Sequence, residues 1–237
     1  MDTSTEKNTC LLRSEMLAYT MQKPVFQIFR KLINSEVIEE VRACICLAAW
    51  RRGWIERPDD NRTSKKLVRL AHHDPEFVAF QAEVLASDPI VSLRVNSNLQ
   101  DAIAIAANSS VKPIQADVCR ITFPNEPNGT PPHQDAAYLR QFELWTAWIP
   151  LFSCPLSLGP LEFADPSSAT HLHAHSSEGI ADKLDCSWQS VPVGVGDVVI
   201  FNGRAIHRSR PNRTCDRVRL SVDLRFAALT AQDRLES

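Results

Sequence analysis

The spacing of hydrophobic residues divides the chain into a helical first part and a β-rich second part. In three early segments, apolar residues recur every three or four positions, which predicts amphipathic helices. Ser35 and Asp74 are typical helix-capping residues, and Pro75 is well placed in a first helical turn. The helices are therefore expected to begin at Ser35, at Asp74-Pro75 and near Leu99. The first two are expected to end at Arg51-Arg52-Gly53 and at Ser87-Asp88-Pro89.

From residue 114 onward the segments become short, rich in β-branched and aromatic residues, and separated by proline and glycine. This pattern predicts strands over 116–123, 144–151, 160–164, 190–193, 197–202 and 217–226. Helices followed by strands favour an α+β fold, with the helices packed on a mostly antiparallel sheet. Residues 1–20 are expected to form a poorly ordered tail. No repeat or linker divides the rest, so residues 21–237 are expected to form a single domain.

The last predicted strand carries the clearest alternation of polar and apolar residues. Five apolar residues alternate with four polar ones over residues 218–226. Because side chains point alternately to the two faces of a strand, one face should be apolar and the other polar. The polar face has two interpretations. It meets bulk water if the sheet is half exposed, and it lines a wet functional cavity if the strand lies inside a barrel. The polar face of this strand consists of Arg219, Ser221, Asp223 and Arg225.

Charge and composition narrow the range of functions. The chain has 26 basic and 28 acidic residues without a long run of one sign, so a nucleic-acid surface is not expected. Its apolar stretches are far shorter than the about 20 residues that span a bilayer, and no secretory signal is recognisable, so a cytoplasmic location is expected. The seven cysteines are scattered without a CxxC pair, which favours buried free thiols in a reducing compartment.

One short motif has the spacing of a metal site. His133 and Asp135 are two residues apart, so on an extended strand both side chains would point to the same side. A second histidine, His207, lies 74 residues further on, and it is expected at the end of the apolar strand formed by residues 198–201. Two imidazoles and one carboxylate make the facial triad of non-haem Fe(II) oxygenases, which leaves other coordination positions open. An isolated HxD motif is common by chance, so the surrounding sequence has to indicate whether this one binds a metal.

The surrounding sequence reads PPHQDAAYL, LWTAWIPL, LGPLEF and then GDVVIFNGRAIHRSRPNRTCDRVRLSVDLRF. In this order and spacing, the segments resemble the phytanoyl-CoA dioxygenase family, which belongs to the Fe(II)/2-oxoglutarate-dependent dioxygenase superfamily. The resemblance covers about residues 114–227. It implies a double-stranded β-helix (jelly-roll) core over 111–230, with the helical part, 21–110, packed on the major sheet.

The resemblance also implies roles for individual residues. His133, Asp135 and His207 would bind iron, and Arg219 would clamp the far carboxylate of the cosubstrate 2-oxoglutarate. A guanidinium fork suits that task because it binds a carboxylate through two charge-assisted hydrogen bonds. The resemblance implies further contacts with the cosubstrate for Ser209, Trp148 and Arg120. Core packing remains an alternative role for Trp148, and a salt bridge remains an alternative role for Arg120.

The implied reaction consumes O₂ and 2-oxoglutarate, releases succinate and CO₂, and oxidises a carbon of a small-molecule substrate. Related halogenases carry a small residue where this chain has Asp135, so hydroxylation, desaturation or ring formation is expected instead. The short chain without a recognisable peroxisomal signal favours a biosynthetic tailoring role. Two other functions stay open: a cupin-like metal-dependent isomerase that needs no O₂, and a non-catalytic binding protein on the same fold. Arg219 and the segment HRSRPNRT speak against the isomerase, and the complete triad speaks against the non-catalytic protein.

The sequence departs from the family pattern before the second histidine. Where the family often reads PGSH, this chain has drifted in spacing over residues 164–171, which suggests an altered lid over the site. His171, His173 and His175 alternate there in a way that resembles a metal site. Because they fall in a loop that varies in the family, they are expected to be solvated loop histidines, with substrate contact as the alternative.

Overall fold

The computed structural model describes residues 25–65, 70–71, 73–126, 129–139, 143–165 and 171–229. The tail expected over residues 1–20 lies outside this part of the chain. The helical elements are α2 (Ser35–Arg51), α3 (Pro75–Leu85), α4 (Asp88–Arg94), α5 (Ser97–Ala107), the short α6 (Asp135–Leu139) and the 3₁₀ turn η1 (Leu156–Leu158). The strands are β1 (Phe26–Phe29), β2 (Val111–Pro113), β3 (Val118–Thr122), β4 (Leu144–Pro150), β5 (Leu161–Ala164), β6 (His175–Ser176), β7 (Gly179–Ile180), β8 (Trp188–Gln189), β9 (Val198–Asn202), β10 (His207–Ser209) and β11 (Arg219–Ala228).

The three predicted helices are present, with two differences at their ends. The side chain of Asn34, rather than Ser35, caps α2 by accepting a hydrogen bond from the Glu36 amide at 3.0 Å. The prediction that residues 87–89 only terminate a helix was wrong. α3 already ends at Leu85, and Ser87 instead precedes the additional helix α4, with proline again in the first turn.

The strands form antiparallel sheets. The major sheet has six strands in the order β1-β9-β4-β11-β2, with β3 also pairing with β11. A smaller sheet has the order β10-β5-β8, and β6 and β7 form a separate hairpin. The predicted combination of helices with antiparallel sheet is therefore confirmed. The prediction of a strand over 190–193 was wrong, because the strand in this region is β8. β1 and β10 were not predicted.

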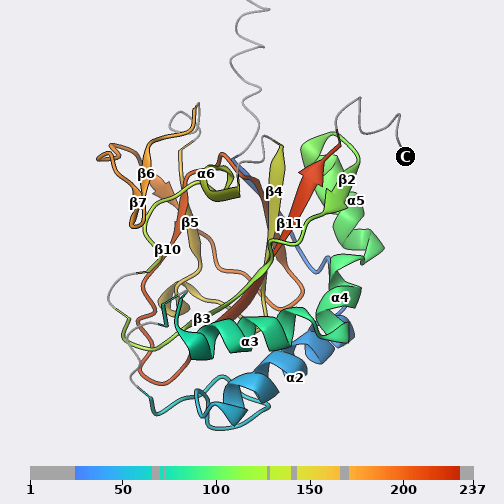
Figure 1. Cartoon of the computed structure of the whole chain (residues 1–237), viewed down its shortest axis with the longest axis vertical. Coiled ribbons are helices and arrows are strands. Elements are labelled where there is room, and N and C mark those ends of the chain that lie inside the picture. Colours follow the sequence, from blue (N-terminus) through green and yellow to red (C-terminus); the bar gives the residue numbers. More distant parts are fainter. Residues whose placement is uncertain are drawn as a thin grey trace, which may run out of the picture.

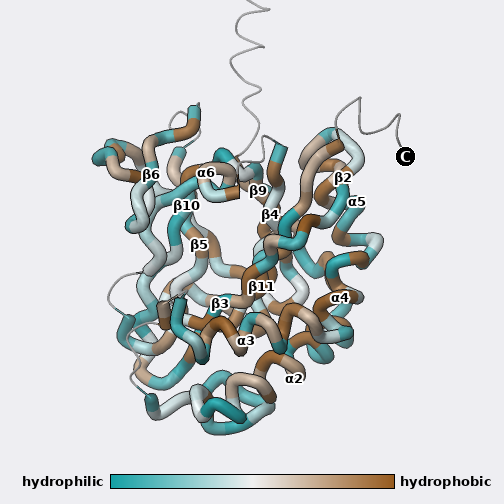
Figure 2. The backbone as a smooth tube through the Cα atoms, viewed as in Figure 1, coloured by the Kyte–Doolittle hydropathy of each residue, from teal (hydrophilic) through white to brown (hydrophobic). Residues whose placement is uncertain are grey.

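The major sheet lies between two hydrophobic clusters. In Figure 1, α2, α3 and α4 lie along one side of the sheet and α5 lies beside β2, and Figure 2 shows hydrophobic residues recurring along these helices. One cluster joins helix residues such as Phe80 and Ile45 to the outer face of the sheet. The other joins Trp148 and Phe201 of the major sheet to Phe163 of the smaller one, so the two sheets face each other.

Strand β11 has an apolar face and a polar face, and both are buried. Its apolar residues lie in the helix-packed cluster, whereas all four polar residues of the alternation are 5% exposed or less. In the register with β4, Asp223 lies opposite Trp148 and Arg225 opposite Thr146. The second interpretation of the alternation, a polar face directed into the interior, is the one that the structure shows.

The remaining general predictions have mixed outcomes. No helix in the described ranges is long and apolar enough to cross a membrane. All six described cysteines are free thiols, but only some are buried, and Cys215 is exposed.

The helical layer should contribute strongly to stability. Phe80 of α3 is fully buried against the sheet, whereas Val78 on the same helix is 51% exposed. We expect Phe80→Ala to lower the free energy of unfolding by about 3–5 kcal/mol, because it leaves a cavity. Val78→Ala should change it by about 0.5 kcal/mol or less. Urea unfolding of both variants checks this, and similar small losses in the two would contradict the packing described.

Candidate metal centre

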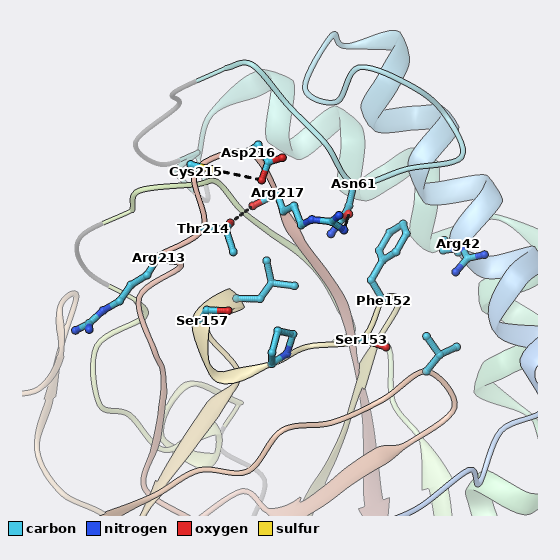
Figure 3. A pocket seen from close by; sticks show the side chains of 13 residues that line it. Arg42, Asn61, Phe152, Ser153, Ser157, Arg213, Thr214, Cys215, Asp216 and Arg217 are labelled. Atoms are coloured by element: carbon cyan, nitrogen blue, oxygen red, sulfur yellow. Dashed lines mark hydrogen bonds between the residues drawn. The ribbon is translucent and has the colours of Figure 1, made fainter.

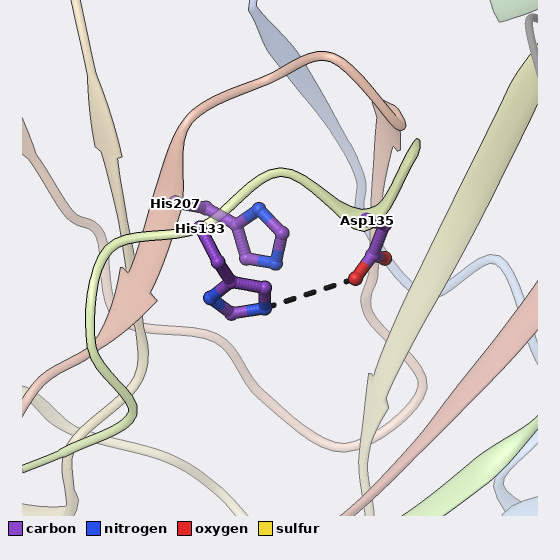
Figure 4. Close-up of side chains that lie close together, drawn as sticks. All are labelled: His133, Asp135 and His207. Carbon is purple, nitrogen blue, oxygen red and sulfur yellow. Dashed lines mark ion pairs between the residues drawn. The ribbon is translucent and has the colours of Figure 1, made fainter. Parts of the chain in front are cut away.

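Three side chains that are distant in the sequence meet in the interior. His133, Asp135 and His207 are all buried, and each offers a ligand atom that lies within 4.8 Å of those of the other two. The two imidazole rings lie side by side, with centroids 4.2 Å apart, and Asp135 faces them (Figure 4). His133 Nε2 is 3.7 Å from Asp135 Oδ1. The structure thus brings together the three residues that the sequence predicted as iron ligands.

The backbone holds the two histidines in register. The amide of each donates a hydrogen bond to the carbonyl of the other, at 2.9 and 3.0 Å. Each ring Nδ1 then lies beside a backbone carbonyl, 2.8 Å from Pro131 O for His133 and 3.0 Å from Ala205 O for His207. Because a carbonyl only accepts hydrogen bonds, Nδ1 carries the proton in both rings, and Nε2 presents a lone pair. Carbonyl contacts of this kind orient imidazole ligands in metal sites.

The local conformation of the motif differs from the prediction in two respects. His133 forms a bridge with His207, but Asp135 begins the short helix α6, so the pair does not lie on an extended strand. His207 begins β10 after a turn, rather than ending the preceding apolar strand, β9. The predicted convergence is correct, but it arises from a bridge followed by a helical turn.

Burial sets the protonation of the two imidazoles. Burial and the neighbouring His207 lower the pKa of His133 to about 3. Burial also lowers the pKa of His207. Both rings are therefore neutral near pH 7, which is the form that binds a metal.

The carboxylate ligand has partners that sequence reasoning did not identify. Asp135 contacts the guanidinium of Arg225 through both oxygens, and its Oδ2 accepts a hydrogen bond from Thr146 Oγ1 at 2.7 Å. Burial alone would raise the pKa of Asp135, but Arg225 and the two imidazoles outweigh it, so the pKa lies below its ordinary value. Asp135 is thus ionised and ready to bind a cation. The alternation of β11 had placed Arg225 on the polar face without assigning it a role.

Arg219 lies fully buried at the start of β11. Its Nη1 donates a hydrogen bond to Gly159 O, whereas Nε and Nη2 have no hydrogen-bond partner among the described residues. Gly159 adopts φ +81°, and a Cβ there would lie 2.5 Å from Arg210 O, so glycine is required at this turn. A buried guanidinium with two free nitrogens is costly unless an anion completes it. This arrangement fits the carboxylate of a small molecule such as 2-oxoglutarate.

Three further side chains differ in whether they have a hydrogen-bond donor free for such an anion. Trp148 Nε1 and Ser221 Oγ are also buried without a hydrogen-bond partner in the described structure, and both residues are on inward-facing positions. Ser221 was not predicted as a contact, although its place two residues after Arg219 on a strand was a usable signal. Ser209 Oγ, by contrast, bonds to the Thr130 amide and hydroxyl at 2.7 and 2.9 Å.

Arg120 forms a salt bridge, which was one of the two roles predicted for it. Its Nε donates to Asp223 Oδ2 at 2.6 Å. Asp223 follows Arg219 by four residues and precedes Arg225 by two, so the three side chains share one face of β11. Arg120 also lines the cavity beside the triad, so a salt bridge and a ligand contact do not exclude each other.

Gln134, between the two ligands of the motif, is fully buried and fastens the histidine-rich segment to the site. Its amide nitrogen donates to His171 O at 2.8 Å and Arg204 O at 2.7 Å, and its oxygen accepts from the His173 amide at 2.9 Å. His175 Nε2 accepts a hydrogen bond from the Gln134 backbone amide at 3.0 Å. The expectation of a freely solvated loop histidine was therefore wrong for His175. His171, His173 and His175 are thus each hydrogen-bonded to Gln134. The sequence carried no signal for these contacts.

A cavity of about 480 Å³ opens beside the triad. Its lining combines His133 and Asp135 with Arg120, Arg225 and Tyr138. This volume is within the range of small-molecule sites. A larger cavity of about 820 Å³, formed by loops that follow β4 and precede β11, contains none of the predicted site residues (Figure 3). The cavity at the triad is therefore the candidate substrate site.

Several solved structures share this fold. The epimerase SnoN in complex with Fe³⁺, alpha-ketoglutarate and nogalamycin RO is 17% identical, with a TM-score of 0.66 over 90% of this chain and 83% of that one. The alpha-ketoglutarate-dependent carbocyclase SnoK from nogalamycin biosynthesis is 16% identical, with a TM-score of 0.62 over 87% and 80%. EvdO2 from Micromonospora carbonacea var. aurantiaca, complexed with 2-oxoglutarate, is 17% identical, with a TM-score of 0.60 over 87% of both chains.

At the level of sequence, no curated protein matches the chain. A family profile does match, namely that of phytanoyl-CoA dioxygenase (PhyH), over residues 25–220. This range is well over half of the chain and includes all of the predicted site residues. The chain therefore belongs to the phytanoyl-CoA dioxygenase family, and the Fe(II)- and 2-oxoglutarate-dependent oxidoreductase expected from its sequence is confirmed at the level of that family.

Proposed function

We propose that this enzyme hydroxylates an unactivated carbon of a small-molecule metabolite in secondary-metabolite biosynthesis, with 2-oxoglutarate and O₂ as cosubstrates. Succinate and CO₂ are the coproducts. The observation that carries the proposal is Arg219, a buried guanidinium with two unbonded nitrogens in the same interior as three convergent metal ligands. A metal site alone serves many reactions, but a metal site together with an unpaired guanidinium that can bind a carboxylate fits a keto acid cosubstrate.

In this proposal each residue has a defined task. The Nε2 atoms of His133 and His207, together with Asp135 Oδ1, hold iron on one side and leave the other coordination positions free. Iron supplies the activation of O₂ when it is bound, and the protein supplies orientation and protection from side reactions. Arg219 binds the far carboxylate of 2-oxoglutarate, and donors on the neighbouring inward positions complete that site. These donors are Trp148 Nε1 and Ser221 Oγ.

Two other predicted contacts have different supporting geometry. Arg120 lines the cavity beside the triad, and only its Nε is committed to Asp223, so its other nitrogens are available to a bound oxygen atom. Ser209 already bonds to Thr130, so we propose that it acts mainly by fixing the Thr130 segment against β10.

We further propose that the two facing sheets are the sides of a double-stranded β-helix. The shared cluster of Trp148, Phe163 and Phe201 between the sheets supports this arrangement. On this view, residues 21–237 form a single catalytic domain, in which the helical part, 21–110, braces the major sheet from outside and the metal lies within the core over 111–230.

The substrate is proposed from the site and from the neighbours together. SnoN and SnoK both come from nogalamycin biosynthesis, and this supports a tailoring role. These neighbours also include an epimerase and a carbocyclase, so the outcome for the substrate carbon depends on how the cavity presents it. A succinate-release screen against a panel of metabolites, with His133→Ala as the blank, identifies the substrate. Metal-dependent turnover without O₂ would instead favour the isomerase alternative.

Arg219 should determine the affinity for 2-oxoglutarate. Breaking a buried ion pair costs about 3–5 kcal/mol, and about 1.4 kcal/mol corresponds to a factor of ten. We therefore expect Arg219→Ala to raise the apparent Kd for 2-oxoglutarate by about 100- to 1,000-fold, measured by titration of the Fe(II) protein without O₂. Arg208→Ala is the matched control, because Arg208 bonds to Glu162 and stacks on Trp188 outside the cavity. An unchanged Kd in Arg219→Ala would refute the clamp.

Trp148 offers a test between core packing and cosubstrate binding. Replacing it by phenylalanine keeps an aromatic ring but removes a hydrogen bond to a charged group, worth about 1.5–3 kcal/mol. We expect Trp148→Phe to raise the Kd for 2-oxoglutarate at least about tenfold. Trp145→Phe is the control, because Trp145 lies on the same strand with an equally unbonded Nε1 but packs against the helix-side cluster. Equal effects of the two substitutions would assign Trp148 to core packing alone.

A further inference from the structure

Asp135 is the end of a chain of alternating charges in the interior. Arg225 Nη2 lies 3.2 Å from Asp135 Oδ1 and 3.9 Å from Asp223 Oδ2. Asp223 Oδ2 in turn accepts the 2.6 Å bond from Arg120. The side chains of Asp135 and Arg225 are only 3% and 6% exposed. The metal ligand is therefore held in a protein environment that already balances its charge.

The contacts around Asp135 treat its two oxygens differently. Oδ2 accepts from Thr146 Oγ1 at 2.7 Å and lies 3.4 Å from Arg225 Nε. Oδ1 is the oxygen that faces His133 Nε2. A carboxylate that could rotate freely could also offer both oxygens to one metal ion and occupy a further coordination position. The contacts on Oδ2 oppose that rotation.

Arg225 is itself held in place from outside the site. Its Nη1 donates to Ala116 O, and its backbone amide donates to Asp117 Oδ1 at 2.9 Å. Asp117 Oδ2 accepts a 2.6 Å bond from Arg94 of α4. The segment between β2 and β3 therefore connects the helical layer to the arginine that contacts the metal ligand.

We propose that Arg225 is a positioning residue for the metal centre: its guanidinium fork, with Thr146, holds Asp135 so that Oδ1 alone is presented to the metal. This inference rests on the proposed function, because it requires that the triad binds a metal ion. It assigns a role to a residue that neither the sequence motif nor the family resemblance singled out.

A simple counter-charge role makes the opposite prediction for metal affinity. A cation close to a metal ion repels it, so removing a mere counter-charge should leave metal binding unchanged or make it tighter. Removing a residue that orients a metal ligand should weaken metal binding, typically by about 10- to 100-fold. The sign of the change therefore separates the two roles.

The experiment measures Mn(II) affinity in the absence of 2-oxoglutarate, by the electron paramagnetic resonance signal of the free ion. We expect Arg225→Gln to weaken Mn(II) binding by about 10- to 100-fold. Arg225→Lys should also weaken it, because lysine keeps the charge but cannot form the two-nitrogen contact. Thr146→Val should weaken binding in the same direction. Arg208→Gln is the control, because Arg208 bonds to Glu162 outside the cavity, and it should leave the affinity within about threefold.

Each result has a definite meaning. Binding as tight as that of the wild type in Arg225→Lys, or tighter binding in Arg225→Gln, would overturn the positioning role. If Arg225→Gln does not fold, as judged by circular dichroism, Arg225→Lys decides, because it retains the buried charge. Loss of Mn(II) binding in His133→Ala establishes that the triad is the site measured. Absence of Mn(II) binding in the wild type would overturn the proposed metal centre and this inference together. Unchanged Mn(II) affinity in both Arg225 variants would overturn this inference alone.

Discussion

The structure depends on how strand β11 buries charge. Its polar face places two arginines, an aspartate and a serine inside the protein, where charge is costly unless it is paired. Arg225 is paired with Asp135, and Asp223 is paired with Arg120. Arg219 has only the carbonyl of Gly159 as a partner in the described structure. Among the charged side chains of this face, Arg219 is thus the one without an ion-pair partner in the described structure, and it fits the carboxylate of a cosubstrate.

Backbone hydrogen bonds bring the two histidines of the candidate metal site together. The reciprocal hydrogen bonds between His133 and His207 join two segments that are far apart in the sequence. Gln134 then ties the same motif to the turn before His207 and to the histidine-rich segment. Gly179 of the β6–β7 hairpin packs so closely that a Cβ there would lie 2.4 Å from Pro132 O. The β6–β7 hairpin, whose Ser177 lines the cavity, therefore packs directly on the segment that carries His133.

Some of this could be predicted from the sequence because the signals are local. The alternation in β11 follows from the two-residue period of a strand, and Asp74-Pro75 marks a helix start by its own chemistry. The triad was found through motif residues in a family pattern. Short elements such as β10 were missed, because a three-residue strand is defined by its partner β5 rather than by its composition.

The partners of site residues are the other part that could not be predicted. Arg225 and Asp135 are 90 residues apart, and no local pattern connects them. The same is true of His175 and the Gln134 amide. The prediction of an extended conformation for the HxD motif was wrong, because α6 begins at Asp135. A helical turn, rather than a strand, directs the carboxylate toward the histidines.

The central claim is that one interior holds both the metal ion and the keto acid cosubstrate. Visible absorption of the protein mixed with Fe(II) and 2-oxoglutarate under anaerobic conditions tests it most directly, because a keto acid chelated to Fe(II) gives a charge-transfer band. The account predicts this band in the wild-type protein and its loss in His207→Ala. A band of equal intensity in His207→Ala, or no band in the wild type although it binds both Fe(II) and 2-oxoglutarate, would contradict the account.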